Sequence, residues 1–210
     1  MAEPGLAAAV AAVKAFQHKR FECGYADLLA DPRYAGAARF FLDDLYGPAD
    51  FSDRDAQFVR IVPALVRLFP REIVGTVAEL AELHALSERL DTAMGATGVP
   101  LDMGSVEYAA AWRAVAEPAS RERQIGLMVS VGAALDRYTR NLLLRQSLRV
   151  MRRPAQAAGL GALQQFLERG FDTFRAMRGA EDFLALIAAR ERALAQALFD
   201  GQPGTLLPLD

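Results

Sequence analysis

The sequence predicts an all-α protein: a single domain of about eight helices packed around one long, central, apolar helix at about residues 119–152. Three observations favour this fold class. Residues of high helix propensity, chiefly Ala, Leu, Arg, Glu and Gln, dominate the 210-residue chain. No Asn-Gly or Asp-Gly pair stands between alternating apolar runs, as it would in a β-hairpin. Proline and glycine recur at intervals that end helices.

Capping residues and helix-ending residues set the boundaries of these helices. The predicted helices span about residues 5–30, 32–47, 52 onward, 70–95, 102 or 105–117, 119–152, 155–177 and 181–199. A break is expected in the first helix at Gly24, because glycine is a poor helix former. The second helix has Asp31 as a suitable N-cap and Pro32 as a first residue, and it ends at Gly47.

Prolines and a glycine delimit the third and fourth helices. The third helix begins at Ser52, which has capping-box spacing to Asp55. Pro63 lies within this helix and is expected to kink or split it, because proline removes a backbone hydrogen bond. The fourth helix begins at Pro70 and ends at Gly95.

The last helices are predicted from their apolar periodicity. The 119–152 helix is apolar on nearly all sides, which is typical of a helix at the centre of a fold or at a subunit interface, and Pro154 marks its end or a sharp bend. The next helix has apolar residues at helical spacing, at Leu160, Leu163, Phe166, Leu167, Phe171, Phe174 and Met177. The eighth ends before Gly201, so we expect a domain at 1–201 and a C-terminal tail at 202–210.

Composition and charge exclude several classes of protein. The chain has 24 basic and 26 acidic residues, so no overall charge draws it to nucleic acid or to an anionic membrane. No apolar run approaches the ~18 residues of a membrane span, and the first residues lack the pattern of a secretory signal. Cys23 is the single cysteine, which excludes an internal disulfide and fits a reducing compartment. We therefore expect a cytoplasmic protein.

His84 and Asp91 are candidate ligand-binding residues. Together with Glu88 they lie on one border of the buried side of the 70–95 helix, because residues four and seven positions apart share a helix face. A histidine oriented by a carboxylate is the minimum of a general base, and a single histidine could also bind haem. A half-buried structural histidine has the same pattern, and we favour this interpretation because no nucleophile stands at a matching spacing.

The segment 40–55 combines five acids, one arginine and four aromatic residues. In a functional interpretation its carboxylates, Asp44 among them, lie near Tyr46 and Arg54 and bind a ligand. In a structural interpretation, which we favour, the segment is a helix–loop–helix corner whose acids stabilise helix N-termini. Asp43 and Asp44 oppose the dipole at the end of their helix, and this predicts a basic partner, an arginine.

Arg145, Arg149 and Arg152 form a stripe along the second half of the 119–152 helix. The stripe is a candidate anion-binding site and could contact nucleic acid. Favourable charge near a helix C-terminus and ion pairs to neighbouring helices explain the same residues. We favour the structural interpretation because the overall charge is balanced.

Other motifs of enzymes and metalloproteins are missing from the sequence. It has no HExxH or CxxC spacing, so no metal site is predicted, and no glycine-rich nucleotide-binding loop. No catalytic motif is present, so the sequence favours a protein that is not an enzyme and leaves any cofactor unknown.

A resemblance to a family rests on three segments: FFLDDLYGPADFSDRD (40–55), ELHALSERLD (82–91) and LQQFLERGFDTFRAMRGAEDFL (163–184). In these the chain resembles an uncharacterised family of bacterial all-helical proteins with an FFLxDLYGPxDFSxRD-type motif. The resemblance spans most of the chain. It implies a single bacterial domain and assigns neither an activity nor a site residue.

Three functions are compatible with these observations. The favoured one is a non-enzymatic binding or interaction protein that forms homo-oligomers, because apolar residues make up 52% of the chain and no catalytic spacing is present. The second is a binder or enzyme for haem or another apolar ligand, with an interhelical pocket near His84. The third is nucleic-acid binding through the arginine stripe.

Overall fold

The computed structural model describes residues 4–45, 56–62, 70–202 and 204–207, and in this part of the chain it contains helices and no β-strand. The predicted all-α fold class is confirmed. The elements are α1 (Pro4–Gly24), α2 (Ala26–Ala30), α3 (Ala35–Arg39), the π-helix η1 (Phe40–Leu45), α5 (Arg71–Gly95), α6 (Ser105–Val115), α7 (Pro118–Thr139), α8 (Leu142–Ala157), α9 (Gly161–Ala176), α10 (Glu181–Phe199) and the 3-10 helix η2 (Gly204–Leu206). Residues 56–62 are also helical.

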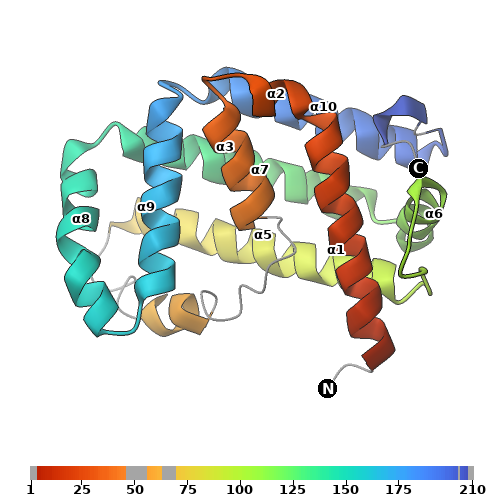
Figure 1. The fold of residues 1–210 in the computed structure, drawn as a ribbon, viewed down its shortest axis with the longest axis horizontal. Helices are drawn as coiled ribbons and strands as arrows, with labels where there is room; N and C mark the ends of the chain where they lie inside the picture. The colour runs from red at the N-terminus through yellow and green to blue at the C-terminus, as the bar shows by residue number, and fades with distance from the viewer. Residues whose placement is uncertain (1–3, 46–55, 63–69, 203, 208–210) are drawn as a thin grey trace.

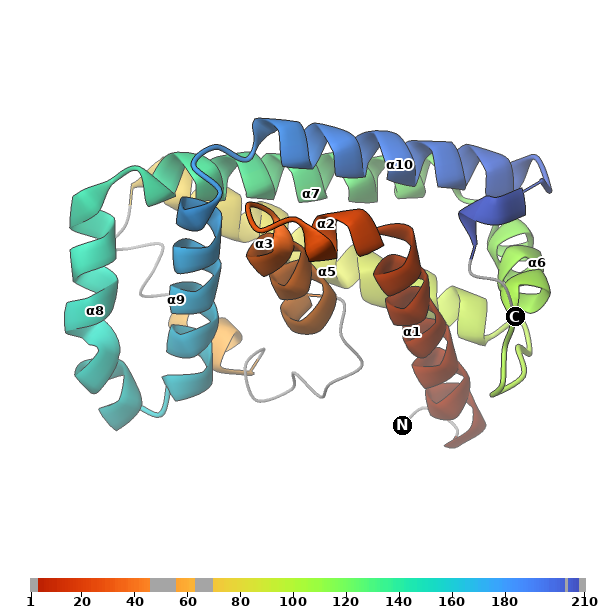
Figure 2. The same cartoon turned by 45° about the horizontal axis from the view of Figure 1, so that its top comes forward.

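The helices form two crossing layers. The long helices α5, α7 and α10 lie side by side, and α1, α3, α9 and α8 run across them (Figure 1). Figure 2 shows the same arrangement from a second direction, with α8 at one end of the molecule and α6 at the other. The helix α8 is therefore the outermost element at its end.

The centre of the fold is α7, which packs against α5, α10, α9 and α8. Its apolar residues contact neighbours on more than one side, and Ile125, Leu127, Met128 and Val131 are buried. Gly132 allows α10 to approach closely, because a Cβ atom there would lie 2.5 Å from Leu184 Cδ2.

The helix expected at 119–152 is divided into two in the structure. The chain turns at Arg140 and Asn141, between α7 and α8. Asn141 has an extended backbone (φ −89°, ψ 106°), and its side-chain oxygen accepts hydrogen bonds from the backbone N–H groups of Leu143 at 3.0 Å and Leu144 at 3.4 Å. This N-cap stabilises the start of a new helix in a new direction. Pro154 lies inside α8, which continues to Ala157.

The other boundaries agree with the predicted ones in part. The interruption after Gly24, the start after Pro70 and the end at Gly95 lie where the sequence placed them, as does the 181–199 helix. The second predicted helix begins later, as α3, and continues into η1. The helix expected at 155–177 begins at Gly161. Ser52 and Pro63 lie outside the described residues.

Apolar side chains form two buried clusters. The larger one joins α1–α3, η1, α7, α9 and α10 and includes Phe41, Phe174 and Phe183. The smaller one joins α1, α6 and the end of α10, with Tyr108 and Trp112 at its centre. Leu207 of the C-terminal tail is buried in the smaller cluster, so this part of the tail lies along the body of the protein.

Candidate functional site

The structure separates His84 from Asp91. Asp91 is 5% exposed, whereas His84 is exposed on the same helix, α5. The helix α1 crosses α5 over its C-terminal half, where Lys14 pairs with Glu88 and a Cβ atom on Gly95 would meet the α1 backbone. Asp91 lies beneath α1, and His84 lies two turns earlier on α5. The two side chains therefore do not line one pocket.

Asp91 belongs to a buried polar group between α1, α5 and α7. Its carboxylate accepts a hydrogen bond from Gln17 Nε2 at 2.9 Å. Arg121 is also 5% exposed, and its guanidinium lies 3.8 Å from the centre of the Trp112 ring and donates to Met94 Sδ. Burial raises the pKa of Asp91 and lowers the pKa of Arg121. These contacts anchor α1 to the long-helix layer.

A second carboxyl group of the interior, Glu191 on α10, is partly buried, with its side chain 19% exposed, and it has charged partners. Arg20 contacts both of its oxygens, at 2.8 and 3.1 Å, and the Tyr25 hydroxyl donates to it at 2.7 Å. Burial opposes the ionisation of Glu191, but the Arg20 charge and the hydrogen bonds from Arg20 and Tyr25 hold its pKa below the usual range. Burial also raises the pKa of Tyr25. The group joins α1 to α10 through a partly buried ion pair.

The acidic corner is described only at its start. Tyr46 and Arg54 lie outside the described residues, and Asp44 is placed by its backbone within η1. Asp43 Oδ1 lies 3.7 Å from His18 Nε2 of α1. The arginine partner expected from the sequence stays a prediction, because Arg54 lies outside the described residues. The ligand-binding interpretation of Asp44, Tyr46 and Arg54 stays a prediction.

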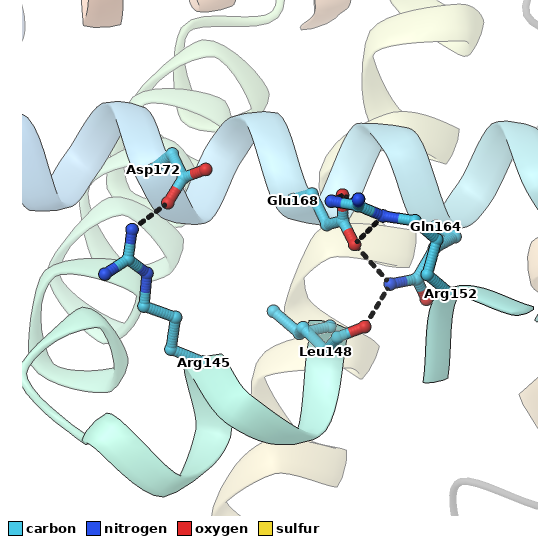
Figure 3. A network of polar contacts seen from close by, with 6 residues as sticks. All are labelled: Arg145, Leu148, Arg152, Gln164, Glu168 and Asp172. Carbon is cyan, nitrogen blue, oxygen red and sulfur yellow. Dashed lines mark hydrogen bonds and ion pairs between the residues drawn. The ribbon is translucent and has the colours of Figure 1, made fainter. Parts of the chain in front are cut away.

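The arginine stripe lies between α8 and α9. Arg145 contacts Asp172 at 3.3 Å, and Arg152 contacts Glu168 at distances down to 2.6 Å (Figure 3). Gln164 donates to the Leu148 carbonyl at 2.6 Å and to Glu168 at 3.0 Å.

Arg149 differs from the other arginines of the stripe. It is exposed and has no carboxylate within ion-pair distance among the described residues. The other two arginines, Arg145 and Arg152, are neutralised by acids of α9. The pocket that the stripe lines together with α9 has a volume of about 40 Å³. Such a volume has room for water and not for a nucleotide.

The opposite side of α8 is apolar and exposed. Leu142, Leu143, Val150 and Met151 are 63%, 72%, 75% and 51% exposed, and no described residue covers them. Leu143 and Val150 lie within about 20° of each other around the helix, whereas Leu142 and Met151 lie about 90° to either side. We call Leu143 and Val150, with the exposed Gln146 and Ser147 between them, the outer face of α8. Large apolar side chains grouped on one exposed helix face are typical of a protein-interaction surface.

The sequence contained a signal for this surface. A helix that is apolar on all sides is either central or at a subunit interface, and the predicted 119–152 helix had this property. In the structure α7 is the central helix, and four large apolar residues of α8 are exposed. The missing information was Asn141, the N-cap that separates the two helices.

Other kinds of site have little support in the described part of the chain. No group of three or more His, Cys, Asp and Glu residues is placed to hold a metal ion there. A shallow groove of about 430 Å³ between α5 and α7 is bordered by Arg89 and Arg123, which are engaged with Glu117 and Glu82. Among the described helices, none has both the length and the hydropathy that crossing a bilayer requires.

The fold and these sites define an all-α protein with a partly buried ion pair and with exposed apolar side chains on α8. The chain belongs to the family described as a domain of unknown function, DUF8198, whose model matches residues 1–205. No curated protein and no solved structure matches the chain.

Proposed function

We propose that this protein is a non-enzymatic binding protein that associates with a protein chain through the outer face of α8. The observation that carries this proposal is the exposure of Leu143 and Val150, each above 70% on a regular helix. Leaving such side chains in water costs about 1.5–3 kcal/mol each relative to burying them, and a partner removes that cost.

The inner side of α8 supports this role because it holds the helix in place. Arg145 and Arg152 bond to α9, and the Gln164 side chain bonds to the Leu148 carbonyl. A helix that is fixed before association loses little conformational freedom when a partner binds. The outer face of α8 is thus presented on a rigid support.

The alternative functions have less support. A haem or ligand pocket near His84 would require that residue to face a cavity together with Asp91, and Asp91 is buried under α1. Nucleic-acid binding would require free cations along the stripe, and Arg145 and Arg152 are paired with acids. Neither alternative explains the apolar outer face of α8.

We also propose that the protein works in the cytoplasm of a bacterium as a homo-oligomer. The Cys23 thiol is free and exposed, and such a thiol persists best in a reducing compartment. The resemblance described above supports the bacterial origin.

Site-specific photo-crosslinking in cells tests the binding surface. A photoreactive amino acid replaces Gln146 in one variant and Val106 in a control variant. Val106 is a suitable control because it is 70% exposed but lies on α6, at the other end of the molecule (Figure 2). We expect protein adducts from position 146 and few or none from position 106.

The outcome does not depend on knowing the partner. Adducts at position 146 that disappear when Leu143→Glu and Val150→Glu are added support the outer face of α8 as the binding surface. Equal adducts from the two positions, or none from position 146, would overturn the proposed function.

A further inference from the structure

We propose that the partner bound at α8 is an acidic segment of another protein, whose carboxylates pair with Arg149 and Arg153. This partner is one form of the protein chain in the proposed function, so the proposal rests on that function and adds the charge of the partner. The two arginines, and not the apolar residues beside them, identify what is bound.

Basic charge is concentrated in the part of the chain that forms α8 and α9. Between Asp136, near the end of α7, and Glu181, at the start of α10, the sequence has nine arginines and only two acidic residues, a net charge of +7. The rest of the chain has 15 basic and 24 acidic residues, a net charge of −9. The overall charge of −2 therefore conceals one strongly basic part, which attracts an anionic partner.

The fold neutralises only the inner arginines of α8. This helix contains four arginines and no acidic residue. Arg145 and Arg152 are paired with Asp172 and Glu168 of α9, which are the two acids of the basic part (Figure 3).

The other two arginines of α8, Arg149 and Arg153, have no such partner. Both are exposed, and neither has a carboxylate within ion-pair distance among the described residues. Because they stand four positions apart, they are neighbours on the helix surface and repel each other. Carboxylates from a partner would relieve this repulsion.

The two arginines form an edge beside the outer face of α8. At about 100° per residue, Arg153 lies about 60° and Arg149 about 100° from Val150 around the helix, both on the same side of it. One turn, or about 6 Å, separates them along the helix. An amphipathic segment with two carboxylates one turn apart can pair with both arginines while its apolar side chains cover Leu143 and Val150.

A protein segment fits this arrangement better than a nucleic acid or a membrane. The phosphates of a nucleic acid would pair with the arginines, but they offer nothing apolar to Leu143 and Val150. A helix that lies in a membrane interface needs a broad apolar face, whereas Gln146 and Ser147 border the line of Leu143 and Val150 on both sides.

Photo-crosslinking in cells tests the charge of the partner. The full chain carries the photoreactive amino acid at position 146, and the attached segment is sequenced by mass spectrometry. Three double variants are compared with this protein. Arg149→Glu with Arg153→Glu reverses the charge of the edge, and Arg149→Lys with Arg153→Lys keeps it. Lys19→Glu with Arg113→Glu makes the same change in net charge at exposed positions on α1 and α6.

We expect the glutamate variant at positions 149 and 153 to lose protein adducts at least about tenfold, because like charges would then meet across the interface. The lysine variant and the control at positions 19 and 113 should keep their adducts within about twofold, since distant exposed charges are screened. The attached segment should contain more acidic than basic residues. All substituted positions are exposed, so circular dichroism should match the wild type.

Each adverse outcome has a distinct meaning. Adducts that persist in the glutamate variant, an equal loss in the control, or an attached segment without net negative charge would overturn the acidic partner and keep the proposed function. Adducts that nuclease degrades, or that contain lipid, would replace the protein partner and overturn both proposals. If position 146 gave no adduct in the otherwise unchanged chain, the proposed function would fall, and the acidic partner with it.

Discussion

At the scale of single residues, the pKa values of two interior carboxyl groups, Asp91 and Glu191, are shifted in opposite directions. Asp91 has a neutral amide, Gln17, as its hydrogen-bond donor, and burial raises its pKa. Glu191 has the Arg20 guanidinium at 2.8 Å, and its pKa is lowered despite burial. Burial opposes ionisation of both groups, and only Glu191 has a close enough cation to reverse the effect.

Replacement of Asp91 by asparagine should therefore stabilise the protein at neutral pH. A raised pKa means that the stability contributed by this carboxyl group is fully present below the unfolded pKa of about 3.9 and is lost as the pH rises. Asparagine carries no charge at any pH and can still accept a hydrogen bond from Gln17. In urea unfolding, Asp91→Asn should match the wild type near pH 4 and exceed it near pH 7. A variant that is less stable near pH 7 would show that the attraction to Arg121 outweighs burial.

Glu191→Gln is the matched comparison, and it should destabilise the protein near pH 7, where Asp91→Asn should stabilise it. A lowered pKa means that the stability contributed by Glu191 is present above its unfolded pKa and is lost as the pH falls through the folded pKa. Removing one partner of a buried ion pair leaves Arg20 uncompensated, at a cost of about 3 kcal/mol near pH 7. The cost should shrink in acid, and a loss of stability that is the same at every pH would contradict the assigned pKa direction.

At the scale of the elements, capping and helix-ending residues determined how well the sequence predicted the fold. Pro70 and Gly95 bound α5 as expected, because both act through the local backbone. The break at Asn141 was not predicted, because the residues on both sides are good helix formers and the effect depends on one side-chain oxygen. The sequence therefore predicted which segments are helical, but it did not predict the change of direction between α7 and α8.

Two glycines in α5 allow a test of how closely α1 packs against it. A Cβ atom on Gly95 would lie 2.9 Å from Val10 Cγ2 and 3.1 Å from the Val10 backbone nitrogen, whereas a Cβ atom on Gly75 would have no neighbour within 4 Å. Gly75→Ala should stabilise the protein by about 1 kcal/mol through helix propensity. Gly95→Ala should destabilise it by about 1–3 kcal/mol, since the α1 backbone must move.

Thermal and urea unfolding of the two alanine variants would check this difference. The substitution and the helix are the same in both, so helix propensity alone predicts stabilisation at both positions. If Gly95→Ala stabilised the protein as much as Gly75→Ala, α1 would not approach α5 as closely as the structure shows.

At the scale of the whole molecule, the candidate sites required spatial information that a sequence does not contain. Helical periodicity placed His84 and Asp91 on one side of α5, but the position at which α1 crosses decides which of them is buried. Similarly, Arg145 and Arg152 form a stripe in sequence, and the acids that neutralise them come from α9. The exposure of Leu143 and Val150 likewise depends on the position of α8 at one end of the molecule.

Salt dependence tests nucleic-acid binding by α8, the alternative to the proposed function. Arg149 and Arg153 lie along one edge of α8, and neither has a carboxylate within ion-pair distance among the residues described. If these arginines bound phosphates, affinity for a duplex oligonucleotide would fall steeply as salt rises from about 50 mM to about 200 mM, because binding releases counterions. We expect no such binding, because Arg145 and Arg152 are already paired with acids of α9.

The Arg149→Gln, Arg153→Gln double variant is the control for this measurement, because it removes the two arginines of α8 that have no carboxylate within ion-pair distance among the described residues. Binding by the wild type that weakens with salt and is lost in the double variant would support nucleic-acid binding and contradict the proposed function. Binding that is equal in the two proteins would show that α8 does not carry it.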